Sequence, residues 1–150
     1  MDAFVQPLYE LADFDAIIRQ LKKPGIVQVS GCLDSQKAHF TNGLLREFPF
    51  RLIVAENDLK AKAFYEDFRL YDPEVLYYPA RDLIFYQADI HGNLLTRQRI
   101  QVLRALLERE EVTIVTSIDS CLDCLVPLAV WKEKVIKIRN DSEIDLDRMK

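Results

Sequence analysis

The segment "VSGCLDSQKAHF", residues 29–40, carries residue types of a phosphate-binding loop at the required spacing. A working loop has the form G-x-x-x-x-G-K-[ST]. Its backbone N–H groups surround phosphate oxygens, its lysine reaches the β- and γ-phosphates, and its hydroxyl holds Mg²⁺. Gly31 and Lys37 stand at the right spacing, but Gln36 replaces the second glycine and Ala38 replaces the hydroxyl. The pattern therefore indicates a degenerate phosphate loop.

Two further residues of this loop argue against a bound nucleotide. Asp34 places a negative charge where phosphates would lie. That charge can cancel the attraction of a helix N-terminus for anions, which is worth only about 0.3–1 kcal/mol at an exposed site. Ser35 is explained as a helix N-cap. We therefore predict that no intact cofactor site exists and that the loop is vestigial at Gly31, Ser35, Gln36, Lys37 and Ala38.

A second motif, Cys121-x-x-Cys124, has the spacing of a redox or zinc-binding pair. Zinc needs about four ligands, and Cys32 and His39 are distant in sequence. A redox pair usually opens a helix after a strand, which this position allows, but no proline lies between the two cysteines. We expect both cysteines to be buried structural residues, and we predict no metal site.

Neither histidine, His39 or His91, has an evident carboxylate or nucleophile partner in the sequence, so we predict no catalytic residue. Three arginines, Arg97, Arg99 and Arg104, occur along one expected helix. They can form a phosphate-contacting patch, or they can pair with acidic side chains nearby. The acidic residues available for such pairing are Glu108, Glu110 and Glu111.

The composition excludes several classes of protein. The chain has 150 residues, 49% of them hydrophobic, and a formal net charge of −4. A bare nucleic-acid-binding surface normally has a basic excess, which is absent here. The opening residues have no basic-then-apolar leader pattern, and no stretch approaches the ~18 apolar residues of a membrane span. We expect a cytoplasmic protein with no membrane partner.

Helical and strand patterns alternate along the chain. The expected helices cover 13–23, 35–48, 58–71 and 94–110, and the expected strands cover 26–30, 51–55, 74–79 and 112–117. Asn57 is the expected N-cap of the third helix. The fourth helix is expected to bury a stripe at positions 95, 100, 103, 106 and 107. A short helix within "IDSCLDCLV" should end at Pro127.

This order predicts an α/β fold, with a parallel sheet covered by helices on both faces. Ligands of such sheets bind at the carboxyl ends of the strands, where the degenerate loop is expected. The tail departs from the alternation, with one strand at Lys134–Arg139 and the first turn of a helix near Lys150. We therefore expect a main domain at 1–133 and the truncated start of a second unit at 134–150.

The stretch "YYPARDLIFYQADIHGNLLTRQRIQVLRALLEREEVTIVTSIDSCLDCLVPL", residues 77–128, resembles the N-terminal region of the bacterial transcription-repair coupling factors, the Mfd family. That region is similar in turn to the first helicase-like domain of the excision-repair protein UvrB. The resemblance runs from about Asp13 to the end of the chain. Its most specific parts are "PARD", "LLTRQRI" and "VTIVTSID".

The resemblance implies a P-loop, helicase-like domain, similar to UvrB domain 1a, whose phosphate loop is degenerate. It implies a non-catalytic interaction and regulatory module of transcription-coupled nucleotide excision repair, with no cofactor of its own. In the family, a downstream motor uses ATP and Mg²⁺ to translocate on DNA and displace stalled RNA polymerase, and an inserted domain recruits UvrA. Residues 134–150 would be the opening of that inserted domain. Intramolecular contacts with the rest of the longer protein are also implied.

UvrB carries a tyrosine-rich hairpin that clamps DNA by stacking. Here the corresponding stretch keeps Tyr77 and Tyr78, but it has too few further aromatic residues to form such a clamp. We expect Phe85 and Tyr86 to pin the loop to the core. Two other classes stay open: a nucleotide-binding or ATP-hydrolysing fragment related to UvrB, and a small redox or metal protein.

Overall fold

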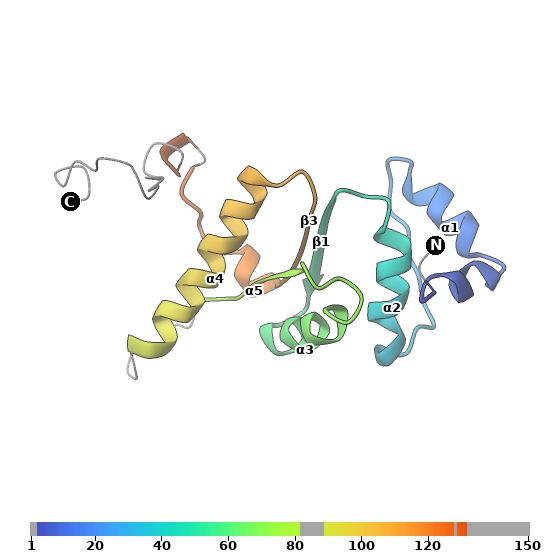
Figure 1. The fold of residues 1–150 in the computed structure, drawn as a ribbon, viewed down its shortest axis with the longest axis horizontal. Helices are drawn as coiled ribbons and strands as arrows, with labels where there is room; N and C mark the ends of the chain where they lie inside the picture. Colours follow the sequence, from blue (N-terminus) through green and yellow to red (C-terminus); the bar gives the residue numbers. More distant parts are fainter. Residues whose placement is uncertain (1–2, 82–88, 128, 132–150) are drawn as a thin grey trace.

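A computed structural model of the chain describes residues 3–81, 89–127 and 129–131, with backbone only for 89–93. The fold is α/β, as predicted. Its sheet has three parallel strands in the order β1-β3-β2 (Figure 1). The strands are β1 (Phe50–Ala55), β2 (Leu76–Tyr78) and β3 (Val112–Ser117). The three strands lie where the sequence predicts them.

Strand β3 is central because its sequence, "VTIVTS", can be buried on both faces. All six of its residues are buried, whereas exposed and half-buried residues alternate along β1. Phe50 pairs with Val112 at the start of the β1–β3 ladder, and Leu76 pairs with Ile114 in the β2–β3 ladder. A continuous run of β-branched and apolar residues is typical of such a central parallel strand.

Two helices cover the two faces of the sheet. Helix α3 (Asp58–Phe68) packs Ala61 and Phe68 against Val115. Helix α4 (Asp89–Glu108) packs against the opposite face, where its residues Val102 and Ala105 share a cluster with β2 and β3 (Figure 1). These helices also connect the strands: α3 joins β1 to β2, and α4 joins β2 to β3. The prediction of helices on both faces is therefore confirmed.

The N-terminal part forms a helical unit beside β1 that packs on the main core through Ala38 (Figure 1). It contains the 3₁₀ helix η1 (Gln6–Glu10) and the helices α1 (Phe14–Leu21) and α2 (Asp34–Leu45). Gly43 of α2 faces Leu8 and Phe14, and a Cβ at this position would overlap the Leu8 side chain. Glycine weakens a helix by about 1 kcal/mol relative to alanine. Here its lack of a side chain allows the close packing of this unit.

The strand predicted at 26–30 is not a strand. The segment is not in the sheet, and Ile26 is 97% exposed. Strand propensity mainly reflects how well a residue packs within a sheet, and no described strand pairs with this segment. An apolar sequence without a pairing partner therefore stays irregular.

The buried stripe predicted for α4 is also wrong. Ile100, Leu106 and Leu107 are exposed, while Arg99, Val102 and Ala105 are buried. The apolar residues of α4 spread over more than one face of the helix, so their spacing does not identify the packed face. Val102 and Ala105 are the α4 side chains that share a cluster with the sheet, and Arg99 is the third buried residue.

The predicted N-cap of α3 and the predicted short helix after β3 are both present, and the short helix covers fewer residues than expected. The Asn57 side chain accepts a hydrogen bond from the Lys60 N–H at 2.9 Å and caps α3 as expected. Helix α5 (Ile118–Cys121) forms, but it ends well before Pro127. The predictions for Phe85, Tyr86 and 134–150 lie outside the described residues. Within the part of the chain that the structure describes, no helix is both long and apolar enough to span a bilayer.

Phe68→Ala should lower the free energy of unfolding by about 3–5 kcal/mol, because Phe68 is fully buried and truncation leaves a cavity. Leu59→Ala on the same helix removes a side chain that is 81% exposed, and it should change stability by no more than about 0.5 kcal/mol. Urea unfolding followed by circular dichroism measures both. Equal losses in the two variants would contradict the assignment of this core.

Candidate functional site

Residues 31–38, which the sequence predicts to be a degenerate phosphate loop, lie at and before the start of α2, outside the sheet, and their side chains bond to one another. Gly31 has a φ of 89°, a conformation that favours glycine. The Lys37 ammonium lies 2.5 Å from the Asp34 carboxylate. This hydrogen-bonded pair holds the pKa of Asp34 below its usual value and the pKa of Lys37 above it. The lysine that would reach a phosphate is thus engaged by a neighbouring carboxylate.

The side chains of Gln36 and Ala38 both make contacts within the protein. The Gln36 side chain accepts a hydrogen bond from the Leu33 N–H at 3.2 Å, so it helps to cap α2. Ala38 is buried in the cluster that contains Ala61 and Phe68. Ser35 is not the N-cap that the sequence predicts, because α2 begins at Asp34 and its N-cap is Leu33. The first turn of α2 therefore uses these positions for capping and packing.

The carboxyl ends of the three strands converge on Asp58, at the first turn of α3. Its Oδ1 atom accepts hydrogen bonds from the Ala80 N–H at 3.1 Å and from the Ser117 hydroxyl at 3.4 Å. The Ser117 and Ser120 hydroxyls lie 2.9 Å apart, and both side chains are buried. The Thr116 hydroxyl donates to the Tyr78 carbonyl at 2.9 Å. This edge of the sheet is therefore joined by a continuous polar network.

Arg99 extends this network to α4. Its guanidinium is 7% exposed, donates from Nη1 to the Pro79 carbonyl at 2.8 Å, and lies 4.2 Å from the centre of the Tyr78 ring. The same Nη1 atom lies 2.7 Å from the Asp123 carboxylate, which is itself partly buried. Arg81 is more exposed and reaches that carboxylate at 3.8 Å. A buried arginine thus links α4, the end of β2 and the segment after α5.

Burial changes the chemistry of the two tyrosines of β2. The pKa of Tyr77 is raised, first by burial and then by its contact with Asp58, and burial likewise raises the pKa of Tyr78. The Tyr77 hydroxyl donates to the Asp58 carbonyl at 3.4 Å. Both phenols therefore stay protonated at neutral pH and act as structural groups in the core.

These contacts decide what the carboxyl edge can do chemically. In open α/β sheets this edge is where ligands usually bind. Here the side chains of Asp58, Ser117 and Arg99 bond to backbone or side-chain groups of the same chain. Most polar groups of this edge therefore hold three elements together, but the buried atoms Arg99 Nη2, Asp123 Oδ2 and Tyr78 Oη have no hydrogen-bond partner among the described residues.

The exposure of the Cys121–Cys124 pair differs from the prediction. Cys121 and Cys124 are free and exposed, whereas we expected buried residues, and Cys32 is half-buried. Helix α5 ends at Cys121, so Cys124 falls outside it and the two residues do not share a buried helical face. Among the residues that the structure describes, no three potential metal-ligating side chains converge.

The histidines and the other arginines that the sequence analysis considered do not take part in the network at the carboxyl edge. His39 stacks on Tyr71 with ring centroids 5.4 Å apart, and its Nε2 atom contacts the Phe4 carbonyl. Arg104 pairs with Glu108 at 2.7 Å, as one interpretation predicts. Arg97 is exposed. The His91 side chain lies outside the described part of the chain.

Sequence reasoning missed the roles of Asp58, Arg99 and Asp123. A signal for Arg99 exists, because it stands three and six residues before Val102 and Ala105 and therefore on the same helical face. Nothing in the sequence points to Asp123 as its partner. The two residues are 24 positions apart, and only the packing of α4 brings them together.

No protein-family profile matches the chain. The chain is similar to the transcription-repair-coupling factors of two strains of Staphylococcus epidermidis, with 25% identity over 124 residues in each case. The aligned region is 81% of this chain and 11% of each relative. The chain therefore spans about a tenth of the length of these curated relatives. This likeness supports a distant relationship to the family that the motifs resemble, and the fold is compatible with a UvrB-like α/β domain.

Asp58→Ala should cost about 1–3 kcal/mol of stability, because it leaves the Ala80 N–H without its acceptor and removes one of the two hydroxyl partners of Ser117. Asp58→Asn keeps an acceptor oxygen and should recover much of that loss. Asp67→Ala changes an exposed residue of the same helix and should alter stability by no more than about 0.5 kcal/mol. If urea denaturation gave Asp58→Ala and Asp67→Ala the same midpoint, the network would not have the role described.

Proposed function

We propose that this chain is a non-catalytic interaction and regulatory module related to the N-terminal region of transcription-repair coupling factors, with a role in DNA repair. The observation that carries the proposal is the 25% identity over 124 residues, which covers most of the chain. The proposal concerns this region alone, because the aligned residues are only 11% of each relative.

The non-catalytic part of the proposal is supported by the geometry of the degenerate loop. Lys37 is paired with Asp34, Gln36 serves as a cap, and Ala38 packs in the core. A phosphate loop needs its lysine and hydroxyl directed at the ligand. The Lys37–Asp34 pair is exposed and is only a weak obstacle to a phosphate, so the stronger support is that Mg²⁺–ATP would find no hydroxyl at Ala38.

The proposed partners follow from the resemblance. We propose that UvrA is recognised mainly through an inserted domain, of which 134–150 is the opening, and that RNA polymerase and DNA are contacted by other parts of a longer protein. The net charge of −4 agrees with a module that does not itself bind DNA. Surfaces of this module would then contact other domains.

An alternative function, a nucleotide-binding fragment related to UvrB, is favoured by one observation. Gly31 keeps a positive φ at the first position of the loop, and Lys37 keeps its spacing. This alternative and the main proposal differ in a single measurable property, the affinity for Mg²⁺–ATP.

Isothermal titration with Mg²⁺–ATP should give no saturable binding below about 1 mM, which corresponds to less than about 4 kcal/mol of binding free energy. Lys37→Ala should give the same result, because the loop lacks the second glycine at Gln36 and the Mg²⁺-binding hydroxyl at Ala38 with or without this lysine. A low-micromolar dissociation constant that Lys37→Ala abolishes would establish the alternative function and exclude the non-catalytic one.

The chain should compete for UvrA at least ~100-fold more weakly than the full-length Staphylococcus coupling factor, a difference of about 2.7 kcal/mol. A specific interface needs about 800 Å² from each partner, and 134–150 would supply only the opening of the inserted domain. A biosensor competition assay with immobilised UvrA measures both affinities. Equal affinities would place the recognition surface within residues 1–150.

A further inference from the structure

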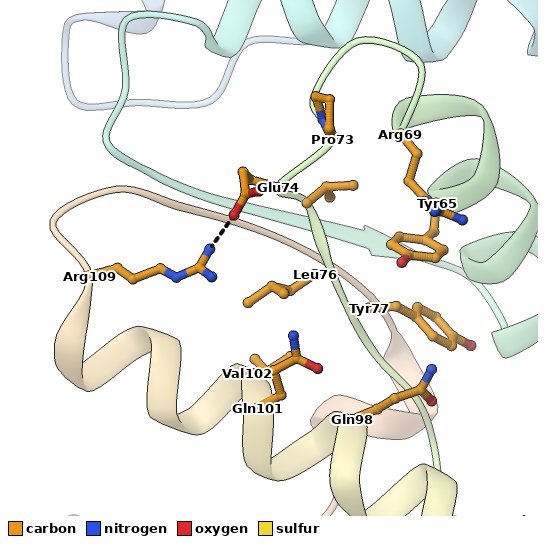
Figure 2. A pocket seen from close by; sticks show the side chains of 11 residues that line it. Tyr65, Arg69, Pro73, Glu74, Leu76, Tyr77, Gln98, Gln101, Val102 and Arg109 are labelled. Atoms are coloured by element: carbon orange, nitrogen blue, oxygen red, sulfur yellow. Dashed lines mark hydrogen bonds and ion pairs between the residues drawn. The ribbon is translucent and has the colours of Figure 1, made fainter.

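Strand β2 is one of the two edge strands of the described sheet, and no described strand pairs with its outer edge, which lines a groove. Its three residues are 7–8% exposed. Its other edge pairs with β3. The groove has a volume of about 230 Å³ and lies between α3 and α4, with Leu76 and Tyr77 at its base (Figure 2). A free strand edge presents unpaired N–H and C=O groups and is a template for pairing with another chain.

The size of the groove favours a peptide over a cofactor. Small-molecule sites usually have volumes of about 300–1,000 Å³ and enclose most of the ligand. This groove is smaller and open to solvent along the strand, so it can take one or two side chains of an extended segment. The walls carry Gln98 and Gln101 from α4 and Tyr65 from α3 (Figure 2). The glutamine amides can both donate to and accept from a peptide backbone.

The charges that line the groove favour an acidic occupant. Arg69 and Arg109 are the cationic lining residues, and Glu74 is the acidic one. Arg109 lies 3.2 Å from Glu74, and both side chains are substantially exposed. Arg69 lies 3.1 Å from Glu66, outside the groove, and 5.5 Å from the centre of the Tyr65 ring. Exposed pairs of this kind contribute at most about 1 kcal/mol, so an incoming carboxylate can compete for either arginine.

We propose that this groove binds an extended acidic segment of a partner protein, which adds as a strand to the free edge of β2. Backbone hydrogen bonds to the edge give affinity, as in other cases of strand addition, and side chains in the groove give specificity. One carboxylate of the segment pairs with Arg109 or Arg69. This inference does not depend on the proposed role in DNA repair.

The test uses a synthetic peptide of about eight residues, long enough to pass β2 and its flanks at about 3.3 Å per residue. In this peptide threonine alternates with glutamate, and matched peptides carry glutamine or lysine in place of glutamate. Heteronuclear NMR spectra of the isotope-labelled chain report where each peptide binds. We expect saturable shifts at Glu74–Tyr78 and along the facing side of α4. Amide exchange in β2 should slow in the complex.

The loss of one charge pair should weaken binding up to about 5-fold, so the glutamine peptide should bind correspondingly less tightly and the lysine peptide least tightly. Arg109→Gln should weaken the glutamate peptide by a similar factor and leave the glutamine peptide unaffected. Arg104→Gln, near the end of α4 and outside the groove, is the matched control and should change neither. Gln101→Glu should weaken the glutamate peptide by adding like charge.

Three results would overturn the proposal. One is the absence of shifts at millimolar concentrations of peptide. The second is a set of shifts confined to surfaces away from β2. The third is equal binding of the glutamate and lysine peptides, which would show that the arginines do not select an acidic segment. Unchanged spectra of each variant in the absence of peptide would establish that the substitutions leave the fold intact.

Discussion

The packing of α4 depends on one buried charge, the guanidinium of Arg99. A charged group inside a protein is costly unless it is paired and hydrogen-bonded. Arg99 meets that requirement in part, with the Pro79 carbonyl, the Asp123 carboxylate and the face of the Tyr78 ring, while its Nη2 atom has no hydrogen-bond partner among the described residues. These three partners come from the end of β2 and from the segment after α5. The position of α4 on the sheet is therefore coupled to the path of the chain at the carboxyl edge.

This coupling explains why the carboxyl edge has a structural role in this chain. Asp58 fixes the start of α3 to the ends of β2 and β3, as Arg99 does for α4. The segment predicted to be a degenerate phosphate loop, at the start of α2, is separate from this network, and its Lys37 pairs with Asp34 while Gln36 accepts from the Leu33 N–H. Surfaces elsewhere, such as the groove along β2, are then where this domain can make contacts.

Elements whose signal is local could be predicted from the sequence. "VTIVTS" is apolar and β-branched throughout and forms the central strand, and Asn57 caps α3 through a bond within four residues. Elements that depend on partners far away in the sequence could not be predicted in this way. Residues 26–30 have the composition of a strand but no described neighbour, and the buried face of α4 is selected by the sheet rather than by its own pattern. The Arg99–Asp123 pair joins residues far apart in sequence, so spacing cannot reveal it.

The most direct test of this account is a double-mutant cycle on Arg99 and Asp123, with Arg99→Met and Asp123→Asn measured singly and together by urea unfolding. A close, partly buried pair should give a coupling energy of at least about 1 kcal/mol. The parallel cycle on Arg81 and Asp123, a more distant and more exposed pair, should give less than about 0.5 kcal/mol. Additive losses for Arg99 and Asp123 would contradict the claim that this buried charge pair closes the carboxyl edge.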